Sequence, residues 1–408
     1  LLEEKDYENY KLYSKIQNPL LYKKLGLQIA PLYILDDVET LSNLEKGEIS
    51  NNLKSDLELL INRSLIIRTD IDTSNREDRQ LLPRTCEIRT VEEALSWLKL
   101  HYSELKKKTE SHIIFILHNF IPAVSAAFAY ASPKDNIVRI ESLWGLPEGL
   151  YYYSHDKFIV DTINADISVA NPDEYKIKKI LHYKKYFVCP MENGDWCVQV
   201  LAAPYDWKSS IQKVSWIKEI SLKTRKIAEA ENTSISVMWF VGVDSTRYGC
   251  EVFPWVHEEF EYNEKRTTPR NKLSFEKTFT LHTLKDIEEM EIQAAQRKGI
   301  IKNVLIQPTD VKILRDKEII SRIGVAAKSI DANIILEGGI LSHAYYQLLR
   351  TGAKVEVRNT FSKVQSLDHN KLVRDKIPEK IEQNGEDAVT IQLEKNILGR
   401  LLKRKLVE

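Results

Sequence analysis

The chain has 408 residues with 59 basic and 59 acidic side chains, so its formal net charge at pH 7 is zero. This length predicts about two to four domains rather than one hydrophobic core. The balanced charge argues against general nucleic-acid binding, and no apolar run is long enough to cross a bilayer. The four cysteines lack a zinc-binding spacing and indicate free thiols in a reducing compartment, so we expect a cytoplasmic protein without membrane contact.

The N-terminal part of the chain predicts a mixed α/β domain. Hydrophobic periodicity and turn residues define its elements. In chain order we expect a helix and a strand in 18–35, a helix and a strand in 55–70, a helix in 90–108, a β-rich stretch in 112–203, a helix in 213–232 and a strand in 234–243. The helix in 90–108 has the clearest start, because Thr90 and Glu93 form the pattern of a capping box.

A polar, charged segment at 258–272 predicts a linker, and helices alternate with strands beyond it. This alternation predicts a small, largely parallel sheet covered by helices. A second linker is expected at 360–370, followed by a charged segment and a final amphipathic helix in 393–408. The fold class predicted is therefore multidomain α/β with an all-α segment at the end.

Lys15 and Arg68 are the first candidates for a binding site. By itself, Lys15 is a solvated lysine and Arg68 is half of an ion pair at a strand end. Their order along the chain, with "LWGLPEGL" after them, resembles the ATP-grasp domain of the phosphoenolpyruvate synthase and pyruvate phosphate dikinase family. The matching segments are "SKIQNPL", "LGLQIAPLYIL", "IIRTD", "ILHNFIPAVSAAFAY" and "LWGLPEGL", which fall within residues 10–255.

This resemblance implies binding of ATP and Mg²⁺. Lys15 and Arg68 would contact the phosphates, where phosphoryl transfer requires positive charge. Glu148, which follows the Trp-Gly-Leu turn, and Glu141, just before it, are further candidates for the same site. The family's metal-binding glutamate is replaced by Met238, which cannot bind Mg²⁺, so the ATP site is either rebuilt or inactive.

The segment "NIILEGGILSHAYYQLLRTGAKVEV" contains Gly338, Gly339, Ser342 and His343 between a predicted strand and a predicted helix. A lone histidine there would simply pack at the start of the helix. The whole pattern, with Gly352 downstream, resembles the phosphohistidine domain of the same family. That resemblance implies that His343 carries a phosphoryl group, which the free N–H groups of the helix N-terminus would stabilise.

The segment "NKLVRDKIPEKIEQNG" resembles the start of MazG-like and phosphoribosyl-ATP pyrophosphohydrolase-like domains. These helical domains hydrolyse nucleoside triphosphates with Mg²⁺ held by clustered carboxylates. The resemblance implies phosphate contacts from Arg374, Asp375 and Lys376, and Glu408 as the first metal-binding carboxylate. The alternative is an exposed charged stretch that packs through its apolar residues.

The sequence thus predicts an ATP-grasp-like domain at 1–262, a phosphohistidine-like α/β domain at 273–360 and the truncated start of a MazG-like domain at 368–408. The leading hypothesis is an ATP-dependent phosphotransferase with His343 as carrier, fused to a nucleoside triphosphate pyrophosphohydrolase. The alternative is a catalytically silent nucleotide sensor that regulates the pyrophosphohydrolase in nucleotide-depletion stress or phage defence. A third hypothesis is an assembly scaffold, since MazG-like domains imply a homo-oligomer.

Overall fold

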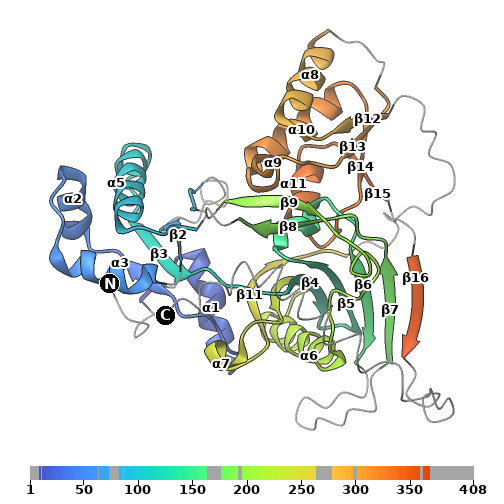
Figure 1. Ribbon diagram of the computed structural model, residues 1–408, viewed down its shortest axis with the longest axis horizontal. Helices are drawn as coiled ribbons and strands as arrows, with labels where there is room; N and C mark the ends of the chain where they lie inside the picture. Colours follow the sequence, from blue (N-terminus) through green and yellow to red (C-terminus); the bar gives the residue numbers. More distant parts are fainter. Residues whose placement is uncertain are drawn as a thin grey trace. The chain divides into compact units, whose positions relative to one another are not determined.

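The computed structural model describes residues 9–10, 12–62, 64–72, 82–85, 87–162, 176–191, 195–262, 278–296, 301–358 and 362–367. The chain divides into two compact units (Figure 1). The first unit comprises residues 1–121 and 191–196, and the second comprises 122–190 and 197–408. The expected first domain, 1–262, therefore contributes to both units.

The first unit is built on a three-stranded antiparallel sheet of order β1-β3-β2. Its elements are α1 (Ser14–Lys24), β1 (Tyr33–Leu35), α2 (Val38–Lys46), α3 (Asn51–Ile61), β2 (Leu65–Ile71), α5 (Val91–Lys108) and β3 (Ile113–Asn119). Leucines of α2, α3 and α5 pack on one face of the sheet, where Leu57, Leu98 and Phe115 are completely buried. The predicted capping box of α5 is present, with Thr90 accepting from the Glu93 amide.

The second unit contains a seven-stranded antiparallel sheet of order β11-β10-β4-β5-β6-β7-β16. Its strands are β4 (Ser125–Ser132), β5 (Asp135–Trp144), β6 (Asp156–Asp161), β7 (Lys176–His182), β10 (Ile235–Val241), β11 (Val252–Glu259) and β16 (Ser362–Leu367). Helix α6 (Val214–Glu231) packs on β4 and β5, and the short helix α7 (Ser245–Tyr248) connects β10 to β11 (Figure 1). A separate hairpin is formed by β8 (Tyr186–Pro190) and β9 (Trp196–Val200).

The second unit also contains the expected parallel sheet, of order β12-β13-β14-β15. The elements are β12 (Thr278–Leu281), α8 (Leu284–Ala295), β13 (Asn303–Ile306), α9 (Val311–Arg315), α10 (Lys317–Ser329), β14 (Asn333–Leu336), α11 (His343–Arg350) and β15 (Lys354–Val357). Helices α8, α10 and α11 pack against this sheet. The prediction of a small parallel α/β sheet is confirmed.

Two expected linkers overlap with strands of the large sheet. β11 extends to Glu259, and β16 occupies much of the second expected linker, where it pairs with β7. The sequence interpretation was wrong at these positions because polar and charged side chains suggested solvated loops. Within the described part of the chain, no helix combines the length and apolarity that crossing a membrane requires.

Candidate functional site

Lys15 and Arg68 lie close together on the first unit. Lys15 is the second residue of α1, where its amide donates to Asp70 Oδ2 at 2.7 Å and its ammonium donates to the Thr69 carbonyl. Arg68 and Asp70 are two residues apart on β2, so both project from the face opposite the leucine core. The structure therefore places these two predicted residues on one patch.

A second arginine, which the sequence interpretation missed, belongs to this patch. Arg84 pairs with Arg68 in an isolated antiparallel bridge, so two guanidinium groups share one neighbourhood. Burial, followed by the charge of Arg84, lowers the pKa of Arg68 to about 10. Burial and these two arginines also lower the pKa of His118 to about 3, so this histidine is neutral. The patch thus combines the two arginines with the carboxylate of Asp70, whose charge acts in the opposite direction on the pKa of Arg68.

The other predicted residues meet in the second unit, where Glu141 of β5 contacts the loop between β14 and α11. Glu141 is 4% exposed and accepts hydrogen bonds from the amides of Ile340 at 3.3 Å and Leu341 at 2.9 Å. These two amides belong to the loop that precedes α11, not to the helix start that was expected to stabilise a phosphoryl group. A carboxylate from the large sheet therefore binds this loop.

The two adjacent glycines are required by this close approach. A Cβ atom on Gly338 would lie 2.0 Å from the Tyr151 carbonyl oxygen, and one on Gly339 would lie 2.4 Å from Glu141 Oε2. The Gly339 amide also donates to the Leu150 carbonyl at 2.7 Å. The glycines therefore let the loop backbone pack directly on β5 and on the 3-10 helix η2 (Pro147–Tyr151).

Ser342 and His343 mark the start of α11. The Ser342 hydroxyl is buried and donates to the Gly339 carbonyl at 2.7 Å, so it closes the loop rather than capping the helix. His343 is the first helical residue, and its Nδ1 lies 3.3 Å from Glu258 Oε2. Its ring packs edge-on against Phe128, with 5.7 Å between centroids, while 27% of the side chain stays exposed. The histidine is therefore packed, yet solvent reaches it.

Basic groups hold Glu141 in its ionised form. Burial alone raises the pKa of Glu141, but His155, then Lys157 and the Leu341 amide, lower it to about 2. His155 Nε2 lies 3.5 Å and Lys157 Nζ 3.9 Å from Glu141 Oε1. Neither partner was identified from the sequence, although Lys157 lies directly opposite Glu141 on the neighbouring strand.

A completely buried ion pair lies at Asp156, the first residue of β6. Lys184 Nζ donates to Asp156 Oδ1 at 2.7 Å, and both side chains are fully enclosed. The other oxygen of Asp156 accepts from the Ser210 amide and hydroxyl at 2.8 and 2.9 Å. Such a satisfied buried pair fixes the local geometry, whereas removal of one partner leaves a buried charge. The ion pair therefore fixes the backbone at Asp156, between the two residues that contact Glu141, His155 and Lys157.

The remaining predicted residues have different outcomes. Glu148 is buried in η2, the same short helix whose Leu150 carbonyl binds the glycine loop. The expected phosphate contacts and metal ligand of the MazG-like segment lie outside the described residues: Arg374, Asp375, Lys376 and Glu408.

The described residues do not fit a Mg²⁺ site. Met238 on β10 lies opposite Val256 on β11, and neither side chain supplies oxygen. The carboxylate of Glu251 binds Lys213 and Trp216, and Asp244 caps α7. In the described ranges, no group of three or more histidine, cysteine or acidic side chains is arranged to hold a metal ion.

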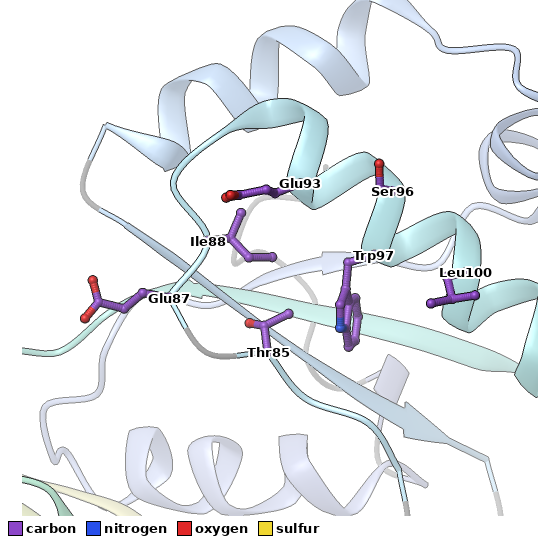
Figure 2. Close-up of a pocket in the computed structure, with 7 residues that line it drawn as sticks. All are labelled: Thr85, Glu87, Ile88, Glu93, Ser96, Trp97 and Leu100. Carbon is purple, nitrogen blue, oxygen red and sulfur yellow. The ribbon is translucent and has the colours of Figure 1, made fainter. Parts of the chain in front are cut away.

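A pocket of about 410 Å³ lies in the first unit, between α5 and the segment before it (Figure 2). Its lining residues are Thr85, Glu87, Ile88, Glu93, Ser96, Trp97 and Leu100. Two of its polar groups are already used by the backbone: Thr85 Oγ1 accepts from the Ile67 amide, and the Glu93 carboxylate accepts from the Thr90 amide. The pocket contains none of the predicted site residues and is not assigned a ligand.

Comparison with known proteins does not assign the chain to a family. No protein-family model and no curated protein matches it. Among solved structures, an ADP complex of N5-carboxyaminoimidazole ribonucleotide synthetase gives a TM-score of 0.29 at 11% identity, over 61% of this chain and 45% of that one. D-alanyl-alanine synthetase A of Vibrio cholerae gives 0.29 at 10% identity, over 60% and 55%.

An ATP complex of the D-alanine–D-alanine ligase of Bacillus anthracis gives a TM-score of 0.26 at 10% identity, over 56% of this chain and 51% of that one. This chain thus spans about half the length of these structures. TM-scores this low establish neither fold nor activity, so the functional argument rests on the residues described above.

Proposed function

We propose that the chain is an ATP-grasp-like nucleotide-binding module that binds phosphates without transferring them, and that it regulates a MazG-like pyrophosphohydrolase. One observation carries this proposal. The Glu141 carboxylate occupies two amides of the glycine loop just before α11, so this loop binds a carboxylate of the chain itself. Met238 in place of the family's metal-binding glutamate supports the same conclusion, because phosphoryl transfer from ATP uses Mg²⁺ to offset the developing charge.

The paired arginines support phosphate binding. An oxyanion near Arg68 and Arg84 would accept bidentate hydrogen bonds from their guanidinium groups, at a patch where Asp70 already contributes one negative charge. Lys15, held at the start of α1 near the same strand, would add a third positive charge. The proposed ligand is therefore a nucleoside triphosphate bound through its phosphates, with no contribution from a protein-bound metal.

Calorimetric titration with ATP, in Mg²⁺ and in EDTA, tests this proposal. We expect binding in both buffers, with a Kd that EDTA does not weaken. Arg68→Gln should weaken the Kd by about tenfold or more, since a hydrogen bond to a charged group contributes about 1.5–3 kcal/mol. Lys54→Gln, an exposed residue of α3, is the matched control and should leave Kd unchanged. Absence of binding, or binding only with Mg²⁺, would contradict the proposal.

A second candidate function is the phosphohistidine carrier, and one contact favours it. Glu258 lies at Nδ1 of His343, so a proton shared there would leave Nε2 as the nucleophilic nitrogen. Incubation with γ- and β-labelled ATP distinguishes the two functions. An acid-labile, base-stable label on the wild type that His343→Ala abolishes would establish the carrier. We expect no such label.

The regulatory part of the proposal rests on the resemblance of residues 370–385 to MazG-like domains. It is tested by the release of pyrophosphate from nucleoside triphosphates. Wild type and Arg68→Gln should reach the same maximal rate, but Arg68→Gln should need about tenfold or more ATP for the same response. The homo-oligomer that the same resemblance implies is tested by size-exclusion chromatography with light scattering. Failure to release pyrophosphate would refute this part while leaving the ATP titration unaffected.

A further inference from the structure

Two cysteines lie opposite each other in the hairpin of β8 and β9. The Leu201 amide donates to the Lys185 carbonyl at 2.9 Å, which sets the pairing of the two antiparallel strands. Four residues closer to the turn on each strand, Cys189 lies opposite Cys197. Their Sγ atoms are 3.6 Å apart. Both are free thiols in the structure.

This position suits a disulfide. Residues at hydrogen-bonded positions of an antiparallel pair have Cα atoms about 5.5 Å apart, which lies within the range that disulfides bridge. A bond would require the two sulfur atoms to approach each other by roughly 1.5 Å, through side-chain rotation together with a small approach of the two strands.

The surroundings of the two thiols differ. Cys189 is buried in an apolar cluster with Trp144, Phe187 and Tyr205, whereas Cys197 packs on the edge of this cluster and is partly exposed. Gln199 Nε2 lies 3.3 Å from Cys197 Sγ and can donate to it. Because Cys197 is the more exposed of the two, it is the thiol that an oxidant reaches first, and Cys189 is the adjacent resolving thiol.

We propose that Cys189 and Cys197 are a redox modification site that a peroxide converts reversibly from a dithiol to a disulfide. The Cys197 thiolate attacks one peroxide oxygen, the O–O bond breaks, and the other oxygen leaves as water after protonation. Cys189 then attacks the sulfenic acid at sulfur, forms the S–S bond and releases a second water. Two thiols lose two electrons and two protons, and the peroxide is reduced to two waters. A thiol reductant reverses the change.

The hairpin packs against the Trp-Gly-Leu turn at the end of β5. The Leu146 amide donates to the Val188 carbonyl at 2.9 Å, and a Cβ atom on Gly145 would lie 2.1 Å from the same oxygen. A disulfide next to Val188 fixes the strand against which this turn packs. Oxidation therefore stiffens the turn that leads into η2. This site does not depend on the proposed nucleotide binding.

Mild peroxide treatment of the native chain, followed by thiol titration in denaturant, tests the proposal. The chain has four cysteines, so the thiol count should fall from four to two and return to four with reductant. Digestion before Asp195 separates the two strands, and the oxidised sample should retain them as one disulfide-linked peptide. Amide hydrogen exchange in 186–200 should slow on oxidation. These measurements use the wild type, so they do not depend on the folding of a variant.

Variants identify the residues involved. Cys197→Ser should keep all three remaining thiols at the same peroxide dose, and Cys250→Ser should still lose two. Cys250 is a suitable control because burial raises the pKa of its thiol and makes it less reactive. The proposal is overturned if all four thiols survive in the wild type, or if the disulfide-linked peptide contains Cys86 or Cys250.

Discussion

At the scale of single residues, Glu141 determines how the glycine loop is held. Glu141→Gln removes the charge that the two loop amides and His155 stabilise, so we expect a loss of about 1–3 kcal/mol in unfolding free energy at pH 7. Urea unfolding followed by tryptophan fluorescence measures this loss. Glu251→Gln breaks an exposed ion pair and serves as the control, with an effect below about 1 kcal/mol.

The same carboxylate predicts a pH dependence. The pKa of Glu141 is lowered from 4.5 to about 2 in the folded chain, so its contribution is complete above pH 4.5 and is lost as the pH falls toward 2. The stability difference between wild type and Glu141→Gln should therefore shrink across this window. A difference that stays constant down to pH 3 would show that the charge is not what holds the loop.

Alanine substitutions at the two glycines of the loop should destabilise the chain to different extents. Gly338→Ala places a methyl group against the backbone of Tyr151, which cannot move aside, so we expect a loss above about 2 kcal/mol. Gly339→Ala places it against the Glu141 side chain, which can rotate at the cost of its hydrogen bonds. Thermal unfolding should rank Gly338→Ala as the more damaging change. Gly339→Ala should cost less when combined with Glu141→Ala, since the two residues are in contact.

The residues of the glycine loop were predictable from the sequence, but their partner was not. Two glycines and a serine before His343 indicate a tight turn at a helix start, and the structure has that turn. Glu141 lies in a different sheet, almost two hundred residues earlier, and no local pattern connects the two positions. The interpretation of Glu141 as a nucleotide ligand came from its neighbourhood in sequence, whereas tertiary packing gives it a structural contact.

At the scale of elements, the best-predicted segment also gives the simplest test. Thr90 and Glu93 cap the start of α5 reciprocally. Thr90→Ala should lower the stability of the first unit by about 1 kcal/mol, because an amide at the helix start loses its acceptor. Ser96→Ala, on the exposed face of the same helix, should change stability by less than about 0.5 kcal/mol. Equal effects of the two changes would exclude a capping contribution.

Elements with clear periodicity were predicted well, and edge strands were not. α5, α6 and the alternating strands and helices after residue 278 have the apolar spacing that burial on one face requires. β11 and β16 form the two edges of the large sheet, where charged and polar residues are ordinary. Composition alone therefore made β16 and the last two residues of β11 resemble linkers.

At the scale of the whole molecule, buried histidines predict loss of stability in mild acid. Burial is the main cause that lowers the pKa of His118 and His182 to about 3 and that of His257 to about 4, all from 6.5. The unfolded chain binds protons at these groups before the folded chain does. Stability is therefore complete above pH 6.5 and falls between pH 6.5 and 4.5, before the shift of Glu141 contributes.

Between pH 6.5 and 4.5, each of these histidines changes the free energy of unfolding by up to about 1.4 kcal/mol per pH unit. Urea unfolding at pH 7.5, 6.5 and 5.5 measures the total slope. His182→Asn should remove the share of one histidine from this total slope. An unchanged slope in His182→Asn would mean that this histidine is protonated in the folded chain.

The path of the chain through the second unit adds a constraint on any ligand of the glycine loop. The four-stranded parallel sheet, β12 to β15, lies in the chain between β11 and β16. These two strands are the opposite edges of the large sheet, so both ends of the parallel sheet are attached to it. The loop amides and Glu141 are thus tethered partners with an effective concentration on the order of millimolar. A phosphate from solution must outcompete a carboxylate that cannot diffuse away. Occupation of Ile340 and Leu341 by an external anion therefore requires either high affinity or prior protonation of Glu141.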